Sequence, residues 1–400
     1  MMALSASKGW KIRSMDIKTA FLQGKYLDRE IFLKPPREAG TKQLCKLRKC
    51  VYGLKDASRY WYLTVSQKLI DAGMQKSKYD DALFYYKRNG KLVGLLSLHV
   101  DDFLSAGSQE FGDDLSHIRK NFVVGSEADT PFKYLGLDIS YDNSYVMFSQ
   151  QSYINGISEY VIENKGNRQR ILDSKEQRSF RALCGQLNWI SSQSRPDIAF
   201  DVCQLSTKLN KATAEDFLYA NKVVRKVKSQ SITLKFGCLQ PPLKLSAFCD
   251  ASFANLKDGG SQGGVIIFIT DQHNNASPIY WTSRKMRRVC RSTISAETMA
   301  LLEATETSFW LASIINELLD SPIKSTEIHI DNLSLFEAAN STTAVEEKRL
   351  RVDLASLRES IVKKEFHLKW LEGGHQLADV LTKQGADSKK LIQALTTGKI

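Results

Sequence analysis

Hydrophobic and polar residues in the first part of the chain follow the periods of short strands and of one amphipathic helix. The segment Trp10–Ile17 has the composition of a strand. The segment Asp56–Ala72 predicts a helix, because Trp61, Val65 and Leu69 recur one helical turn apart. This mixture of elements predicts an α+β unit at the front of the chain.

A β-hairpin is predicted around two adjacent acidic residues. The apolar run Leu92–Val100 is followed by Asp101 and Asp102, and then by the apolar pair Phe103 and Leu104. Two apolar arms around a two-residue polar tip are typical of a hairpin. Asp-Asp, however, is not one of the dipeptides that favour the tight turns of such hairpins.

The middle of the chain changes from polar to helical character. The charged stretch Glu163–Arg181 is typical of a linker or loop. Residues 176–230 carry few strand signals and predict a helical region. The pair Pro241-Pro242 then marks a boundary, because proline ends helices and restricts the residue before it.

Beyond these prolines the pattern is that of alternating strands and helices. Strands are predicted over Leu243–Phe253, Gly263–Thr270, Ile279–Ser283, Glu327–Asp331 and Phe366–Leu371. Helices are predicted over Glu297–Leu319, Leu333–Ala339 (opening at Asn332) and Gln376–Lys383. This order predicts a mixed-sheet α/β domain. The chain is therefore expected to hold two main units joined by a helical connector.

Composition points to one class of partner and excludes several classes of chain. With 42% hydrophobic and 25% charged residues, a disordered, collagen-like or coiled-coil chain is excluded. The net charge of +12 favours a polyanion, nucleic acid first, although a merely soluble basic protein would show it too. The 7 cysteines include no Cys-x-x-Cys pair, so reduced intracellular thiols are expected. No apolar run approaches the about 18 residues of a membrane span, and no signal peptide is expected.

Three acidic residues of the first unit are candidate metal ligands. Asp101 and Asp102 repel each other in an apolar hairpin, and a divalent cation is the simplest way to keep both ionised. Asp16 closes the predicted first strand, so a strand beside the hairpin would bring three acids together. Two metals about 3.5–4 Å apart could then clamp the attacking and leaving oxygens of an in-line displacement. A solvated turn explains the acid pair equally simply when it is taken alone.

Four further acids stand at the ends of predicted elements in the α/β domain. They are Asp250, Glu297, Asp331 and Asp379. Helix-end stabilisation is the simpler explanation for three of them, because Glu297 lies in the first turn of a predicted helix and Asp331 and Asp379 stand where caps occur. Four acids so placed within one domain nevertheless predict a second metal-binding cluster.

A basic run and an aromatic triplet are candidates for nucleic-acid contacts. The run holds Arg284, Lys285, Arg287, Arg288 and Arg291. Such side chains supply most of the non-specific affinity for nucleic acid by contacting phosphates, but a solvated loop explains the run equally well. The triplet Tyr60-Trp61-Tyr62 could stack bases. Core packing is preferred, because Trp61 lies on the apolar helix face.

Taken in order, these motifs resemble the Pol polyprotein of copia-type LTR retrotransposons over nearly the whole chain. Met15–Gly24 resembles the first reverse-transcriptase acid motif, Lys49–Tyr62 the second motif and Val100–Asp102 the paired-acid motif. Phe132–Gly136 is similar to the primer-holding hairpin, and Ser194–Ala199 to the connecting region. The C-terminal unit is similar to the family's ribonuclease H domain.

The resemblance implies roles for individual residues. Polymerase metals would be held by Asp16, Asp101 and Asp102, assisted by the backbone carbonyl of Ile17. Phe21 falls where such enzymes keep the bulky residue that rejects the 2′-hydroxyl of incoming nucleotides. The ribonuclease metals would be held by Asp250, Glu297, Asp331 and Asp379. The implied cofactor is Mg²⁺, two ions per active site, with Mn²⁺ as the alternative ion.

The implied fold is an α+β partial reverse-transcriptase palm with a helical thumb or connection, followed by an α/β ribonuclease H-like domain with a mixed sheet. The expected division is 1–148 for the palm, 149–240 for the thumb or connection, 241–386 for the ribonuclease H-like domain and 387–400 for a C-terminal tail. The family's N-terminal fingers are expected to be lacking, because the first acid motif stands near the start of the chain.

Several residues depart from the family pattern. Asp56 and Ser58 stand where Gln and Pro are usual, and His99 stands where Tyr is usual. An extra acid near a triphosphate would repel it. Related ribonucleases use a mobile histidine before the final acid, for which His367 and His375 are the candidates.

Three functional hypotheses follow. The first is an RNA-directed DNA polymerase with ribonuclease H, acting on an RNA template, RNA/DNA hybrids and deoxynucleotides. The second is a catalytically decayed nucleic-acid-binding remnant, or an open reading frame that is not translated. The third is a lone ribonuclease H whose front half is an inert binding module. The resemblance also implies an intracellular, cytoplasmic location in virus-like particles without a membrane partner, and leaves the oligomeric state open.

Overall fold

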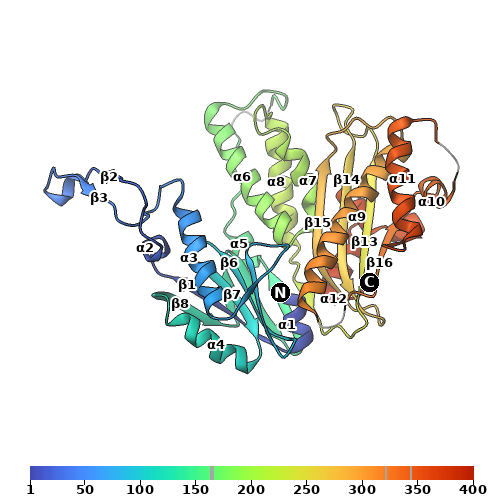
Figure 1. The fold of residues 1–400 in the computed structure, drawn as a ribbon. Coiled ribbons are helices and arrows are strands. Elements are labelled where there is room, and N and C mark those ends of the chain that lie inside the picture. Colours follow the sequence, from blue (N-terminus) through green and yellow to red (C-terminus); the bar gives the residue numbers. More distant parts are fainter. Residues whose placement is uncertain (163–165, 320–321, 343–344) are drawn as a thin grey trace. The chain divides into compact units, whose positions relative to one another are not determined.

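The chain folds into two compact units (Figure 1). The computed structural model describes residues 1–162, 166–319, 322–342 and 345–400, apart from the side chains of 117 and 118. The first unit is built mainly from residues 3–132 and the second mainly from 133–400. Each unit has its own sheets and its own buried core. The four-part division of the chain stays a prediction. No described helix is both long enough and apolar enough to cross a membrane.

The first unit is built on a six-stranded antiparallel sheet in the order β4-β5-β6-β7-β1-β8. Its strands are β1 (Lys11–Ile17), β4 (Gln75–Lys76), β5 (Leu83–Arg88), β6 (Lys91–His99), β7 (Asp102–Gly107) and β8 (Val124–Asp129). A separate ribbon pairs β2 (Phe32–Leu33) with β3 (Cys45–Lys46). The helices are α1 (Met2–Lys8), α2 (Ala20–Gln23), η1 (Arg37–Ala39), α3 (Ala57–Asp71) and α4 (Gln109–Arg119). The predicted first strand and amphipathic helix are confirmed to within a residue at each end.

Helix α3 packs its predicted apolar face into the core of this unit. Trp61, Val65 and Leu69 are buried and join Phe84 of β5 in one apolar cluster. The Trp61 ring N–H also donates to the backbone carbonyl of Val100 at 2.6 Å. Core packing of Trp61 is therefore confirmed, and its one polar atom holds the turn of the paired-acid hairpin.

The turn of this hairpin lies one residue earlier than predicted. His99 pairs with Asp102 across β6 and β7, so the two-residue tip is Val100-Asp101 and Asp102 is the first residue of β7. Val100 adopts a φ of 58°, in the left-handed region that β-branched residues avoid. Primed hairpin turns require a positive φ at their first central residue. The backbone strain at Val100 thus places one acid at the tip and the other in the sheet.

The second unit begins with a four-stranded sheet in the order β12-β11-β10-β9. Its strands are β9 (Phe132–Tyr134), β10 (Leu137–Asp142), β11 (Tyr145–Ser149) and β12 (Leu234–Phe236). The helices that follow are α5 (Gln151–Asn155), α6 (Ser174–Gln193), η2 (Pro196–Ile198), α7 (Ala199–Ser206) and α8 (Ala214–Ser229). The helical region is confirmed, but α6 begins inside the expected linker Glu163–Arg181, because Asp173 and Glu176 form a capping box. Residues 163–165 of that linker lie outside the described residues.

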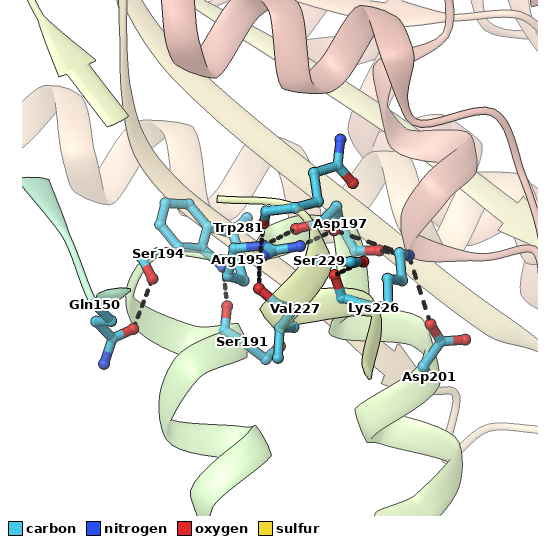
Figure 2. A network of polar contacts seen from close by, with 11 residues as sticks. Gln150, Ser191, Ser194, Arg195, Asp197, Asp201, Lys226, Val227, Ser229 and Trp281 are labelled. Atoms are coloured by element: carbon cyan, nitrogen blue, oxygen red, sulfur yellow. Dashed lines mark hydrogen bonds and ion pairs between the residues drawn. The ribbon is translucent and has the colours of Figure 1, made fainter. Parts of the chain in front are cut away.

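A buried ion pair joins the helices of this connection (Figure 2). The side chains of Arg195 and Asp197, which follow α6, are 0% exposed. The Arg195 guanidinium donates to both Asp197 carboxylate oxygens, at 2.7 and 2.9 Å. It also donates to the backbone carbonyls of Val227 and Gln230 at the end of α8, at 3.2 and 2.8 Å. The motif Ser194–Ala199 therefore ties the end of α6 to the end of α8.

A five-stranded mixed sheet in the order β15-β14-β13-β16-β17 completes the second unit. Its strands are β13 (Lys244–Ser252), β14 (Gln262–Thr270), β15 (Ala276–Lys285), β16 (Ser325–Ile330) and β17 (His367–Trp370). The helices are α9 (Thr293–Leu318), α10 (Leu333–Asn340), α11 (Lys348–Val362), η3 (Gly373–His375), η4 (Leu377–Leu381) and α12 (Lys389–Thr397). Strands β13, β14 and β15 are antiparallel, whereas β16 and β17 run parallel to β13. This sheet confirms the predicted α/β fold class.

Two elements of this domain differ from their prediction in ways that matter for the acids. Helix α9 begins at Thr293, so Glu297 lies in its second turn and not in the first. The predicted helix Gln376–Lys383 is the short 3₁₀ helix η4, capped by the Gln376 side chain, which accepts from the Ala378 N–H at 3.1 Å. The expected tail contains the helix α12, which contacts β12 and β15.

Candidate active site

Three carboxylates of the second unit meet at one end of the mixed sheet. Asp250 lies near the end of β13 and Asp331 follows β16 directly. Because these strands are parallel and pair Phe248 with His329, the two acids come side by side. Asp379 is supplied by η4, which packs on β13 and β14. One carboxylate oxygen from each of these three aspartates lies within 4.8 Å of the other two.

Glu297 adds a fourth acid from α9. Its side chain is 5% exposed, and among the described residues its Oε2 has no hydrogen-bond partner. Burial, followed by the charges of Asp250 and Asp331, raises the pKa of Glu297 to about 9. Because Asn332 caps α10 and Glu297 lies beyond the first turn of α9, helix-end stabilisation accounts for neither Asp331 nor Glu297.

Two residues that the sequence analysis did not single out complete the cluster. Lys383 Nζ lies 2.6 Å from Asp379 Oδ1 and 3.4 Å from Asp250 Oδ1. The Thr382 hydroxyl donates to Asp250 Oδ2. The spacing of Asp379 and Lys383 would have suggested their contact in a helix, but the contact with Asp250 joins residues 133 positions apart.

The donor set of this cluster fits a divalent cation. Four carboxylates face one ammonium group, so the cluster carries an excess of negative charge. Burial raises the pKa of Asp250 to about 6, although Lys383 and Thr382 oppose the shift. Oxygen ligands of this kind are the ones that Mg²⁺ prefers. The residues that would hold it are Asp250, Glu297, Asp331 and Asp379.

The three acids of the first unit meet at one corner of its antiparallel sheet. Asp16 of β1 pairs directly with Asp102 of β7, and the Ile17 N–H donates to the backbone carbonyl of Asp101 at 2.9 Å. Burial, followed by the charges of Asp101 and Asp16, raises the pKa of Asp102. The strand and the hairpin thus lie side by side, as the first acid cluster requires.

The carboxylates of Asp16 and Asp101 have different neighbours at this corner. The Tyr52 hydroxyl donates to Asp101 Oδ2 at 3.1 Å. Asp16 Oδ2 is turned toward Gly125 of β8, where a Cβ atom would lie 2.2 Å from it. Among the described residues, Asp16, Asp101 and Asp102 do not form a set of ligand atoms within 4.8 Å, in contrast to the second cluster. This corner therefore holds the acids without bringing their oxygens together.

Two further residues of the first unit find partners that the sequence did not reveal. Phe21 is buried in α2, with its ring centroid 4.6 Å from that of Tyr52. The Asp56 carboxylate pairs with Arg29 at 2.6 Å. The extra acid at position 56 is therefore partly compensated by a neighbouring guanidinium.

Comparison with known proteins finds relatives among reverse transcriptases and retrotransposon proteins. A family model described as reverse transcriptase (RNA-dependent DNA polymerase) matches residues 1–168. Over 96% of its length, the chain is similar to the retrovirus-related Pol polyproteins of the transposons RE1 from Arabidopsis thaliana, at 27% identity, and TNT 1-94 from Nicotiana tabacum, at 26%. The chain is therefore similar to copia-type retrotransposon Pol proteins over nearly its whole length, and residues 1–168 match the reverse-transcriptase family.

The chain spans 27% of the length of the RE1 polyprotein and 30% of that of the TNT 1-94 polyprotein. Its fold is also similar to that of a foamy viral protease-reverse transcriptase solved in complex with an RNA/DNA hybrid, with a TM-score of 0.51 and 10% identity. That likeness covers 91% of this chain and 44% of the viral chain. It supports the predicted fold, a reverse-transcriptase palm and connection followed by a ribonuclease H-like domain.

The basic run from Arg284 to Arg291 is partly engaged in ion pairs. Arg284 lies 3.4 Å from Glu303, and Arg288 lies 2.7 Å from Asp353. Lys285 pairs with Asp258. Arg287 and Arg291 are exposed, so these two guanidinium groups are the ones best placed to contact a phosphate.

The two candidate histidines differ in how close their elements lie to the acids. His375 ends η3, whose Gly373 adjoins Asp331, because a Cβ at Gly373 would lie 3.4 Å from Asp331 Oδ2. His367 is exposed at the start of β17. The η3 turn therefore makes His375 the better placed of the two, and its role stays a prediction.

Gly264 of β14 allows η4 to approach the sheet closely. A Cβ at this position would lie 2.5 Å from the Leu381 Cβ and 2.9 Å from the Thr382 Cγ2. We expect Gly264→Ala to lower the free energy of unfolding by about 1–3 kcal/mol through overpacking, measured by urea denaturation. Gly185→Ala is the control, because this exposed glycine of α6 has nothing within 4 Å of its Cβ position. It should raise stability by about 0.5–1 kcal/mol, and equal effects of both changes would contradict the close approach.

Metal binding is expected to release protons. The pKa of Glu297 is raised to about 9 and that of Asp250 to about 6, so at pH 7 Glu297 is protonated in the metal-free protein. A ligand must be deprotonated to bind. We expect Mg²⁺ binding at pH 7 to release about one proton and to weaken as the pH falls toward 6, measured by calorimetry in buffers of different ionisation enthalpy.

The same pKa shifts determine whether these groups raise or lower the stability of the metal-free protein as the pH rises. At these two groups the native state binds more protons than the unfolded state, from the ordinary carboxyl range up to about pH 6 for Asp250 and about pH 9 for Glu297, so both groups should lower the stability of the metal-free protein as the pH rises through this window. Glu297→Gln is the control, because it should remove both the proton release at pH 7 and most of this slope. A heat of Mg²⁺ binding that is independent of the buffer in the unaltered protein would show that Glu297 is already ionised.

Proposed function

We propose that this segment hydrolyses the RNA strand of RNA/DNA hybrids with the acid cluster of its second unit. The convergence of Asp250, Asp331 and Asp379 within 4.8 Å carries the proposal. The buried Glu297 supports it, because its Oε2 has no hydrogen-bond partner among the described residues, and a buried ionisable group in such a cluster is typical of a functional site. The hybrid bound by the structurally similar foamy viral protein supports the choice of substrate.

Different residues of the chain would bind the metal, orient the acids and hold the substrate. Mg²⁺, two ions with Mn²⁺ as the alternative, would be held by Asp250, Glu297, Asp331 and Asp379. When bound, such ions stabilise the charge that develops on the phosphate and lower the pKa of water. Strand β13, helix α9 and η4 fix the directions of the acids, and the exposed Arg287 and Arg291 would hold the strand by its phosphates. The 2′-hydroxyl of the substrate distinguishes RNA from DNA.

The test is cleavage of a labelled RNA/DNA hybrid by the full chain in Mg²⁺, with EDTA and a DNA duplex as controls. We expect the RNA strand alone to be cut, and only with the metal present. Hybrid binding that weakens with salt, without metal-dependent cleavage, would instead favour the catalytically decayed nucleic-acid-binding remnant.

A second proposed activity is RNA-directed DNA synthesis by the first unit. The reverse-transcriptase family model that matches residues 1–168 and the pairing of Asp16 with Asp102 favour it. Asp16, Asp101 and Asp102 would hold the metals, and Phe21 would select deoxynucleotides. The test is extension of a primer on an RNA template. Extension would exclude the lone ribonuclease H, and its absence, with hybrid cleavage intact, would leave the nuclease as the sole activity of this segment.

A further inference from the structure

Lys383 occupies the middle of the acid cluster through a side chain that reaches in from the surface. Its side chain is 42% exposed, whereas that of Asp250 is 1% exposed. Its ammonium nitrogen is within 3.4 Å of Asp250 Oδ1 and 2.6 Å of Asp379 Oδ1. An ammonium group on a flexible four-carbon stem can hold such a position and can also leave it.

Each carboxylate oxygen of Asp250 accepts a hydrogen bond from one of two consecutive residues, Thr382 and Lys383. Thr382 donates to Oδ2 and Lys383 donates to Oδ1. A divalent cation that takes Asp250 Oδ1 and Asp379 Oδ1 as ligands would bind the same oxygens that Lys383 contacts. Two cations close together in a buried site repel each other strongly, so the ammonium and the metal exclude one another.

The backbone that carries Lys383 is held from the other side. Gln384 Nε2 donates to the Tyr219 hydroxyl of α8 at 3.2 Å, and this hydroxyl donates to Asp201 Oδ1 at 2.5 Å. The Lys383 N–H donates to the Asp379 carbonyl at 3.0 Å. The chain is therefore anchored on both sides of Lys383, and its side chain is the part that is free to move.

We propose that Lys383 is a tethered counter-cation, which neutralises the acid cluster while no metal is present and swings out to solvent when a divalent cation binds. This inference rests on the proposed nuclease function. It explains why a lysine side chain lies among the acids that would hold the metal. It also predicts that the protein competes with its own cofactor for Asp250 and Asp379.

The first test is calorimetric titration of the full chain with Mg²⁺ in the absence of nucleic acid. Lys383→Met should bind Mg²⁺ at least about tenfold more tightly than the unaltered chain, and Mg²⁺ should raise its melting temperature by more. Lys363→Met is the matched control, because Lys363 also pairs with an acid four residues earlier, Glu359, but on the exposed face of α11. It should leave Mg²⁺ binding unchanged.

The second test follows the movement itself. We expect Mg²⁺ to speed acylation of the Lys383 amine by an amine-reactive reagent several-fold, read by mass spectrometry of the unaltered chain, while the rate at Lys363 stays constant. A rate at Lys383 that is unchanged or lower with Mg²⁺ would overturn the proposal. This readout needs no variant, so it decides the question even if Lys383→Met does not fold, and Lys383→Gln offers a second neutral side chain for the calorimetry.

The outcomes separate this inference from the function on which it rests. Mg²⁺ binding by the unaltered chain that is no weaker than that of Lys383→Met would overturn the counter-cation alone. An unaltered chain and a Lys383→Met variant that both fail to bind Mg²⁺ would overturn the nuclease proposal together with it.

Discussion

Metal-dependent cleavage of the RNA strand is expected to fall by about 10³-fold or more in Asp250→Asn, because this change removes charge stabilisation at the reacting phosphate. Asp250 lies at the centre of the interactions of the cluster, since it contacts Thr382 and Lys383 and its charge raises the pKa of Glu297. Asparagine keeps the shape of the side chain but offers one neutral oxygen in place of a carboxylate. Single-turnover cleavage of a labelled hybrid in Mg²⁺ measures the loss.

The control for this change is Asp387→Asn, an exposed acid on the segment that follows η4. It should leave the cleavage rate unaltered. Asp331→Asn should reproduce the loss, because Asp331 belongs to the same set of converging oxygens. Cleavage that persists at the unaltered rate in Asp250→Asn or Asp331→Asn, with the fold intact by circular dichroism, would remove the basis of the two-metal assignment.

Removal of one partner of the buried ion pair is expected to have the largest effect on stability. Asp197→Ala would leave the Arg195 guanidinium without a counter-charge in a site where both side chains are 0% exposed (Figure 2). An uncompensated buried charge lowers stability by about 3–5 kcal/mol. Urea denaturation followed by circular dichroism would measure the change in the free energy of unfolding.

The matched control is Arg225→Met, which breaks the exposed pair with Glu159. Because exposed pairs contribute little, this variant should change stability by no more than about 1 kcal/mol. A loss of similar size in Asp197→Ala and Arg225→Met would mean that the Arg195–Asp197 pair is hydrated in solution. Asp197→Asn offers a milder change, since its amide oxygen can still accept one hydrogen bond from Arg195.

The order of elements and the positions of the acids were predictable from the sequence, for a physical reason. Strand and helix periods are local, so β1, α3 and β14 are found within a residue of their expected bounds. An acid at or just beyond the end of a predicted strand also stands out, which is why Asp16 and Asp331 were recognised before their neighbours in space were known.

Contacts between distant residues were beyond the sequence. Lys383 ends a predicted helix, but its contact with Asp250 could not be predicted, because this contact depends on how η4 packs across the sheet. The turn at Val100 was misplaced by one residue, since the favoured dipeptides give no warning of a strained valine. Arg195 and Asp197 lay in a recognised motif, yet the burial of their charges depends on the carbonyls of α8.

The cluster takes its acids from four elements in chain order: β13, α9, the end of β16 and η4. During synthesis on the ribosome, three of them emerge long before the fourth. A nascent polypeptide that stops anywhere before Asp379 therefore lacks a complete ligand set, whatever else has folded. Completion of the proposed nuclease centre is therefore timed by translation, and termination before Asp379 would leave the centre without its fourth acid.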